Sequence, residues 1–221
     1  MQTVNNVKVD STPIATLPWP ASIAIDFRRK RFAFFKSLIA SLPRPLRILD
    51  VGGTQAFWEI MGFIQDDIQL TILNTEPVEA TFPNVTCIVG DARDMREFKD
   101  KEFEVVFSNA VIEHVGNLQQ QHSMAKEIQR VGKRYIVQTP NRNFPIEPHV
   151  LIPFFQFFPL NLKVFTATHT PSWGWKAAHI EELSTIRLMS EKELRTFFPR
   201  VQVYKENFLG LTKSFIVYRG W

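Results

Sequence analysis

The spacing of apolar residues predicts one long helix followed by a series of short buried strands. From Ser22 to Leu42 apolar side chains recur every three or four positions, which is typical of a helix, and Pro43 ends it. Five nearly continuous apolar runs follow, and each is typical of a strand buried on both faces. These runs are residues 47–51, 70–73, 85–89, 104–107 and 134–137.

The pattern changes between and after these strands. Residues 118–131 predict a helix, with Asn117 as its cap and Gly132 as the left-handed residue after its end. The alternation of strands and helices then stops. Residues 142–189 are rich in Phe, Pro and Trp and are typical of an insertion. A helix over 190–198 opens with a Ser-x-x-Glu capping box. Two strand-like runs, separated by little more than Leu-Gly, then predict a terminal antiparallel hairpin.

Strands that alternate with helical connections favour an α/β fold, with a mostly parallel sheet and helices on both of its faces. We therefore expect one domain that spans residues 1–221. Its first 20 residues contain three prolines and are expected to form an N-terminal arm. The insertion after the fifth strand is expected to cover the substrate.

Composition and charge narrow the class of protein. A hydrophobic fraction of 45% suits a globular domain with a sizeable core. The single cysteine, Cys87, excludes an internal disulfide and a zinc cluster built on cysteines, and the histidines show no metal-ligand spacing. The net charge of +4 includes one basic run, residues 28–31, which is typical of a solvated helix face. We expect no metal and no nucleic-acid partner, since no nucleic-acid-binding motif accompanies that run.

The sequence also bears on the membrane. Its opening stretch is polar and contains prolines, unlike a signal peptide, and its longest apolar run, residues 150–160, is too short to cross a bilayer. We expect a cytoplasmic protein. Four phenylalanines in that run, together with the basic run, leave open a peripheral contact with an anionic membrane surface.

The first chemical signal lies where the first strand ends, in "LDVGG". The acid Asp50 is followed by Gly52 and Gly53, and small residues there let a ligand approach the backbone at the start of a helix. A tight turn with only a structural role is the alternative.

The next two strands also end in polar residues. Asn74 and Glu76 follow the second strand, where a polar side chain can bind a ribose diol. Asp91 follows the third strand and can accept from an exocyclic amine, while Ala92 leaves room for a base. Because the carboxyl ends of parallel strands meet at one edge of the sheet, these residues predict a site for an adenosine-like ligand.

The stretches "LDVGG", "GDARDM", "FEVVFSNAVIEHV" and "YIVQTPN" resemble those of class I S-adenosylmethionine-dependent methyltransferases. The similarity is closest to the small-molecule group with Glu-His-Val after the fourth strand, and it covers residues 47–141. The resemblance implies a Rossmann-like sheet of seven strands, the last one antiparallel, and S-adenosylmethionine as cofactor. It further implies that Asp50, Gly52 and Gly53 lie near the amino-acid end of the cofactor, Asp91 and Ala92 near the adenine, and Asn109 near the methionine region.

Two features depart from the family pattern. The Gly turn is short, since Thr54, Gln55 and Ala56 follow where further glycines are usual. The ribose position is occupied by Asn74, and Glu76, two residues on, is slightly favoured for that contact.

Candidate catalytic and substrate-binding residues follow the fourth and fifth strands. His114 and His149 are candidate general bases, although Glu113 and His114 alternatively fix the loop, and Glu147 and His149 alternatively form an ion pair. Expected substrate contacts come from the fifth-strand end and the aromatic insertion: Asn141, Glu147, Trp173, Trp175 and His179.

These residues predict methyl transfer from S-adenosylmethionine to a small, apolar or aromatic acceptor, with oxygen as the expected nucleophile by family analogy. Two alternatives remain. One is a methyltransferase-like enzyme of lipid or cell-surface glycan assembly that works at the membrane. The other is a non-catalytic binding protein with the same fold, which the short turn and Asn74 would favour.

Overall fold

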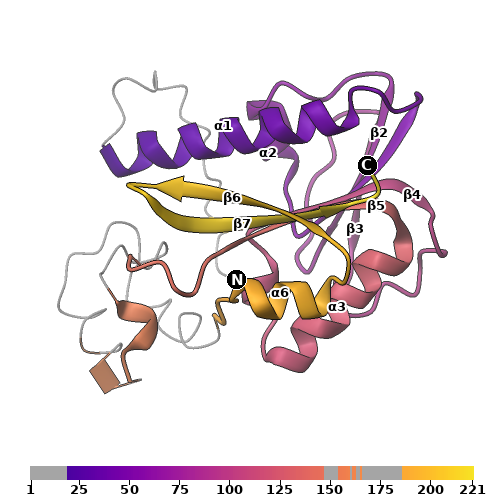
Figure 1. Ribbon diagram of the computed structural model, residues 1–221. Helices are drawn as coiled ribbons and strands as arrows, with labels where there is room; N and C mark the ends of the chain where they lie inside the picture. Colours follow the sequence, from indigo (N-terminus) through magenta and orange to yellow (C-terminus); the bar gives the residue numbers. More distant parts are fainter. Residues whose placement is uncertain (1–18, 147–153, 160, 163–164, 166–185) are drawn as a thin grey trace, which may run out of the picture.

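The computed structural model describes residues 19–146, 154–159, 161, 162, 165 and 186–221 (Figure 1). Its elements are, in chain order, α1 (Trp19–Ile39), β1 (Leu46–Val51), α2 (Gln55–Ile60), β2 (Ile68–Asn74), β3 (Val85–Val89), β4 (Phe103–Asn109), η2 (Ile112–His114), α3 (Leu118–Val131), β5 (Gly132–Pro140), η3 (Phe155–Phe157), α6 (Glu191–Phe197), β6 (Gln202–Phe208) and β7 (Leu211–Arg219).

Seven strands form one sheet in the order β3-β2-β1-β4-β5-β7-β6. The neighbouring pairs from β3 to β5 are parallel, whereas β7 is antiparallel to both β5 and β6. This confirms the predicted fold class, a mostly parallel sheet with an antiparallel terminal hairpin. The chain runs outward from β1 to β2 and β3 and then returns to place β4 on the other side of β1. In open α/β sheets, ligands bind at the carboxyl ends of the strands beside such a reversal.

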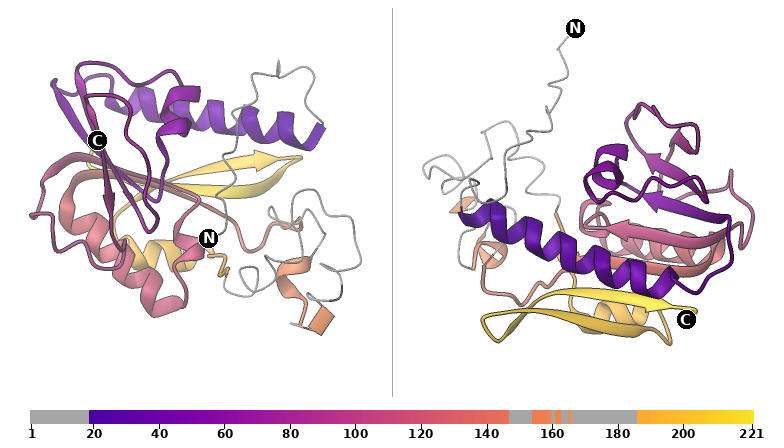
Figure 2. Two further views of the ribbon diagram at one scale, coloured as in Figure 1. Left: turned by 180° about the vertical axis from the view of Figure 1, so that it is seen from behind. Right: turned by 90° about the horizontal axis from the view of Figure 1, so that it is seen from above.

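Helices cover both faces of the sheet, as the views in Figures 1 and 2 show. On one face, α1 and α2 pack on the strands through an aromatic cluster that includes Phe32, Phe35 and Trp58. On the other face, α3 and α6 bury Met124 and Leu194 against the sheet. The sheet is therefore buried between two apolar layers, which accounts for the continuous apolar runs of its inner strands.

Most predicted boundaries are confirmed within about three residues, and two expectations are wrong. β3 lies at the edge of the sheet, so it is not buried on both faces, and Val89 is 60% exposed. Gly132 is not left-handed, because its φ of −96° and ψ of 135° make it the first extended residue of β5. A glycine is still needed there, since a Cβ would lie 2.7 Å from Val106 Cγ2.

The two predicted N-terminal caps and the terminal hairpin are confirmed. Asn117 caps α3 in a capping box, and Ser190 with Glu193 forms the predicted box at α6. The terminal hairpin turns through Leu209 and Gly210, which both have positive φ, as two-residue turns between right-twisted strands require.

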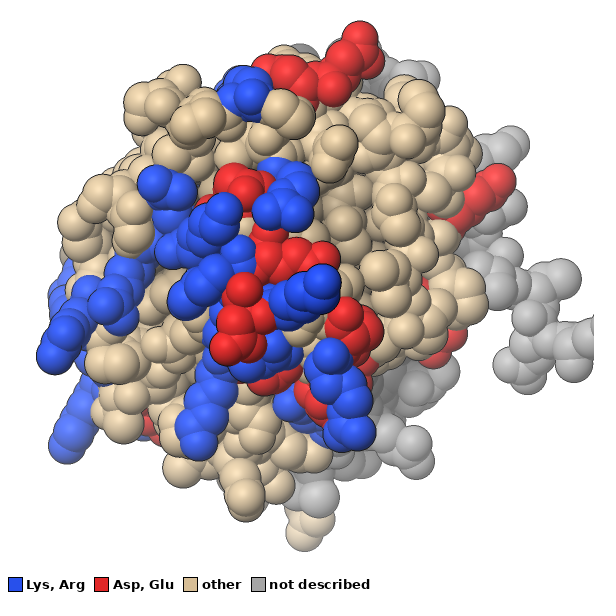
Figure 3. All heavy atoms as spheres, turned by 90° about the vertical axis from the view of Figure 1, so that its right-hand side faces the viewer, with Lys and Arg blue, Asp and Glu red and all other residues tan. Residues whose placement is uncertain are grey.

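Ion pairs join the amino-terminal ends of the strands. Glu104 pairs with both Arg47 and Lys133 at 3.0 Å, and Arg130 pairs with Asp100 at 2.9 Å. Figure 3 shows cations interleaved with carboxylates over the side of the molecule that it faces. Toward the left edge of this view several cations lie without carboxylates between them. Among the described residues, no helix is long and apolar enough to cross a membrane.

Candidate functional site

A cavity of about 620 Å³ opens at the carboxyl ends of β1 to β4. Four chain segments line it, and each follows one strand: Gly52 after β1, residues 73–75 at the end of β2, residues 90–93 after β3, and residues 110, 111 and 114–116 after β4. The cavity thus surrounds the point at which the strand order reverses. Its volume lies within the range of small-molecule sites in proteins.

The turn after β1 brings bare backbone to the cavity wall. Gly52 has a φ of +79°, and a Cβ there would lie 2.5 Å from Val111 Cγ1, so both conformation and space require glycine. Its N–H donates to the Leu73 carbonyl at 2.7 Å, which ties the turn to β2. At Gly53 a Cβ would lie 1.7 Å from Asp50 Oδ2. The short turn therefore depends on both glycines.

Asp50 lies behind this turn and is not among the residues that line the cavity. Its carboxylate is 1% exposed and accepts a hydrogen bond from Trp58 Nε1 at 2.6 Å. Burial raises the pKa of Asp50 to about 7, although the Trp58 hydrogen bond opposes this shift. Asp50 therefore links the turn to α2. It contributes to the cavity through the shape of the turn and not as a lining residue.

Of the two ribose candidates, only Asn74 reaches the cavity wall. Asn74 Nδ2 donates to the Gly53 carbonyl at 2.9 Å, and its Oδ1 accepts from the Glu76 N–H at 3.2 Å. Glu76 itself is exposed. The amide thus also braces the Gly turn, and the ribose contact of either residue stays a prediction.

After β3, Asp91 and Ala92 both line the cavity as the sequence suggested. Asp91 Oδ2 receives hydrogen bonds from Arg93 Nε at 2.9 Å and Nη2 at 2.6 Å. These bonds hold the pKa of Asp91 below its ordinary value. The carboxylate therefore remains ionised and can accept further hydrogen bonds. Ala92 is 9% exposed and presents only a methyl group.

The segment after β4 separates the two members of the Glu-His pair. Glu113 is fully buried, and its Oε2 accepts from the Thr139 hydroxyl at 2.9 Å, which fits the role of fixing the loop. His114 is exposed and lines the cavity. Its role as general base stays a prediction.

A buried polar network lies on the same edge, and the sequence did not reveal it. Arg31 is 8% exposed, and its Nε and Nη2 donate to the Glu206 carboxylate at 3.1 and 3.0 Å. Arg31 Nη1 donates to Gln138 Oε1 at 2.9 Å and to Asn109 Oδ1 at 2.5 Å. Ser214 donates its hydroxyl to Glu206 Oε2, the oxygen that also accepts from Arg31 Nη2. The network joins α1 to four strands, so Arg31 is not part of a solvated helix face.

This network fixes the orientation of the Asn109 amide. A guanidinium can only donate hydrogen bonds, so the amide oxygen of Asn109 must face Arg31. The Nδ2 donor is then directed away from Arg31. Asn109 immediately precedes Ala110, which lines the cavity with a left-handed φ of 57°.

Of the remaining candidate catalytic and substrate-binding residues, the structure describes Asn141, whose substrate contact stays a prediction. Asn141 N and Nδ2 donate to the carbonyls of Lys213 and Thr212 at 2.9 and 2.8 Å, so Asn141 ties the end of β5 to β7. The other insertion residues lie outside the residues that the structure describes: Glu147, His149, Trp173, Trp175 and His179. Residues 1–18 of the predicted N-terminal arm lie outside them as well, whereas its last two residues, Trp19 and Pro20, belong to α1.

Comparisons with known proteins agree with this geometry. Residues 49–135 match a family model described as a methyltransferase domain. A putative methyltransferase from an antibiotic biosynthesis pathway of Anabaena variabilis has a TM-score of 0.53 and 14% identity, over 79% of this chain and 64% of that chain. The CurJ carbon methyltransferase has a TM-score of 0.59 and 12% identity, over 89% of this chain and 54% of that one.

A third structure is the N-terminal domain of EvdMO1, in the presence of S-adenosylhomocysteine and D-fucose. It has a TM-score of 0.55 and 13% identity, over 86% of this chain and 81% of that one. At these identities the likeness shows the fold. The chain spans less than two thirds of the first two structures. No curated protein matches it.

Residues 49–135 thus match a methyltransferase domain, and the chain has a Rossmann-like methyltransferase fold. S-adenosylmethionine is the cofactor of this domain, and the residues present fit it. Small side chains or bare backbone at Gly52, Gly90 and Ala92 leave the wall open at the ends of β1 and β3, and a Cβ at Gly90 would lie 2.7 Å from Leu73 Cδ1. The ionised Asp91 supplies an acceptor beside Ala92, as a nucleoside requires.

Proposed function

We propose that the protein transfers the methyl group of S-adenosylmethionine to a small, apolar or aromatic acceptor, at an oxygen atom. The observation that supports this most directly is the cavity at the carboxyl ends of β1 to β4, where the Gly turn, Asp91, Ala92 and His114 meet. The oxygen preference comes from family analogy. The similar folds include a carbon methyltransferase, so the fold does not select the atom.

In this proposal each segment of the wall binds one part of the cofactor. The Gly52–Gly53 turn accommodates the amino-acid end, Asn74 binds the ribose, and Asp91 with Ala92 receives the adenine. Asn109, held by Arg31, directs an amide donor toward the methionine region. Holding two reactants in line contributes about 7 kcal/mol or more to lowering the barrier when the geometry is good.

The cofactor supplies a methyl group that is already activated, so the protein has to orient the acceptor and remove its proton. In this proposal His114, which lines the cavity, acts as the base, and His149 is the second candidate. General-base catalysis contributes roughly 10²–10⁴-fold to the rate. An acceptor carboxylate would carry no proton and would need no base.

Two alternative functions predict different experimental results. A non-catalytic protein with this fold would fail to bind the cofactor. An enzyme of lipid or glycan assembly at the membrane would bind the cofactor and also sediment with anionic liposomes, and Phe154→Ser and Phe158→Ser would weaken that sedimentation.

Calorimetric titration with S-adenosylmethionine and S-adenosylhomocysteine tests the proposal. We expect micromolar binding by the wild type and at least tenfold weaker binding by Ala92→Leu, which fills the space beside Asp91. Ala80→Leu makes the same change at an exposed position outside the cavity and should bind as the wild type does. Thermal melting of each variant shows whether it folds. Absence of binding by a folded wild type would reject the proposal.

A further inference from the structure

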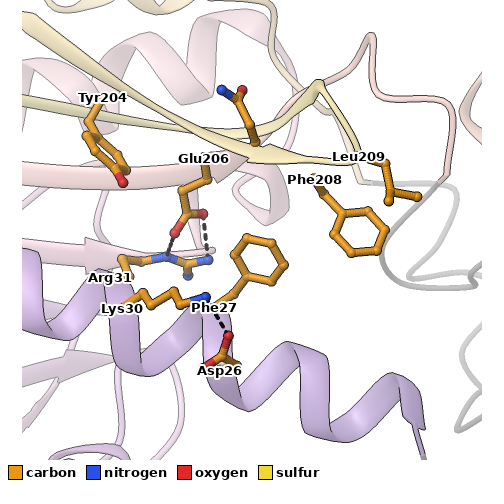
Figure 4. A pocket seen from close by; sticks show the side chains of 9 residues that line it. Asp26, Phe27, Lys30, Arg31, Tyr204, Glu206, Phe208 and Leu209 are labelled. Atoms are coloured by element: carbon orange, nitrogen blue, oxygen red, sulfur yellow. Dashed lines mark hydrogen bonds and ion pairs between the residues drawn. The ribbon is translucent and has the colours of Figure 1, made fainter.

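A second cavity, of about 350 Å³, lies between α1 and the β6–β7 hairpin (Figure 4). Side chains from both elements point into it. The residues that line it are Asp26, Phe27, Lys30, Arg31, Tyr204, Glu206, Asn207, Phe208 and Leu209. None of them belongs to the lining of the cofactor cavity.

The second cavity adjoins the expected position of methyl transfer. Arg31 forms part of its wall and donates to Asn109, the last residue of β4, and to Gln138 near the end of β5. The two residues that follow Asn109 line the cofactor cavity. A molecule in the second cavity therefore lies one residue layer away from the end of the cofactor that we assign to Asn109.

Two ion pairs balance the charges within the wall itself. Lys30 pairs with Asp26 at 2.7 Å, and Arg31 pairs with Glu206 at 3.0 Å. The first pair is exposed, whereas the second is buried and held by further hydrogen bonds. These four charges cancel, so the wall alone would not select an ion.

Two further cations, Lys213 and Arg28, interact with wall residues although they are not among the residues that line the cavity. Lys213 is half-buried, and its Nζ lies 4.3 Å from the ring centre of Phe27, a wall residue. Burial, followed by the charge of Arg31, lowers the pKa of Lys213. Arg28, which follows Phe27 in α1, is exposed, and desolvation followed by the charge of Arg31 lowers its pKa. Within the described part of the chain, neither cation has a carboxylate at ion-pair distance.

Such cations favour an anion. The half-buried charge of Lys213 has no carboxylate at ion-pair distance among the described residues and is disfavoured there, and a bound carboxylate or phosphate would compensate it through charge-assisted hydrogen bonds, with the exposed Arg28 as a second donor. The neighbouring apolar groups suit the remainder of such a molecule, because Phe27, Phe208 and Leu209 line the cavity and Leu209 is 86% exposed.

We propose that the second cavity binds an anionic group of the acceptor, a carboxylate or a phosphate, through Lys213 and Arg28, while Phe27 and Phe208 contact its apolar part. The acceptor is then an amphiphilic acid. This inference rests on the proposed function and specifies its substrate class.

Titration with three ring compounds that differ in their head group tests the inference: phenylacetate, phenyl phosphate and the neutral phenylacetamide. With protein saturated by S-adenosylhomocysteine, we expect at least one anion to bind tenfold or more tightly than the amide. The tighter of the two anions identifies the head group. Lys213→Gln should lose at least fivefold of the anion affinity and keep its affinity for the amide and for S-adenosylhomocysteine.

Lys205→Gln is the matched control, since it removes one positive charge from the same hairpin at an exposed residue paired with Glu191. It should leave the anion preference unchanged. Equal binding of anions and amide, or equal effects of the two lysine variants, would overturn the inference.

The same titrations without S-adenosylhomocysteine separate the two proposals. A protein that binds S-adenosylhomocysteine but shows no anion preference retains the proposed function and loses this inference. A protein that prefers anions but does not bind S-adenosylhomocysteine has an anion site that is not an acceptor site, which overturns both.

Discussion

The buried carboxyl of Asp50 predicts a pH-dependent gain in stability for Asp50→Asn. Burial raises its pKa from 3.8 to about 7, so between these two pH values the folded chain holds a proton that the unfolded chain has released. The free energy of unfolding therefore falls as the pH rises through this window, by about 1.4 kcal/mol per pH unit, until the folded carboxyl ionises near pH 7. Above pH 7 the ionised form costs the folded state about 4 kcal/mol in total.

The asparagine side chain has nearly the same shape, stays neutral, and retains an oxygen that can accept from Trp58 Nε1. The stability difference between Asp50→Asn and the wild type should therefore grow by about 3 kcal/mol in favour of the variant between pH 5 and pH 8. For a chain of this size that corresponds to a relative increase in Tm of about 6–12 °C.

The assay is thermal melting of both proteins at pH 5, 6, 7 and 8, without cofactor. Other titrating groups cancel in the difference, and Asp66→Asn controls for removal of an exposed carboxylate. A Tm difference that does not change with pH, or that shifts in favour of the wild type at pH 8, would refute the reasoning.

Further predictions concern the turn, the buried network and the base. Gly53→Ala places a Cβ 1.7 Å from a carboxylate oxygen, so it should lower the free energy of unfolding by about 1–3 kcal/mol and weaken cofactor binding, as melting and calorimetry would show. Arg31→Met leaves Glu206 buried without its cation and should cost about 3–5 kcal/mol in urea unfolding. Adding Glu206→Gln should recover part of that loss; no recovery would mean that the charge is not the cause. If His114 is the base, His114→Ala should lower kcat by about 10²-fold or more while S-adenosylhomocysteine binds within threefold of the wild type. The same comparison for His149→Ala assigns the base to one residue or the other, and unchanged turnover makes the replaced histidine structural.

The fold was predictable because its signals are local. The apolar runs and helical spacing placed nearly every strand and helix, and the caps at Asn117 and Ser190 set their ends. The exceptions needed information from distant residues. The exposure of β3 follows from its edge position, and Gly132 is extended because the backbone enters β5 directly, next to Val106.

The site was predictable in part. Residues that follow strands were brought together as expected, because parallel strands end at one edge. The hydrogen-bond partners of those residues were not predictable. Trp58 donates to the carboxylate of Asp50, and Arg93 donates to that of Asp91. Arg31 was misinterpreted because three basic neighbours suggested solvent. Its spacing, four residues before the buried Phe35, was the signal that it faces inward.

The link between Arg31 and Glu206 also has a consequence for biosynthesis, because the two residues are 175 positions apart in the chain. At typical elongation rates, about 9–35 s separate the synthesis of the arginine from that of its carboxylate. All residues that line the cofactor cavity, which lie between positions 52 and 116, have been synthesised before Glu206 is added. The residues of the cofactor wall are therefore synthesised first, and the wall beside Asn109 can be completed only after the β6–β7 hairpin has been synthesised and docks on α1.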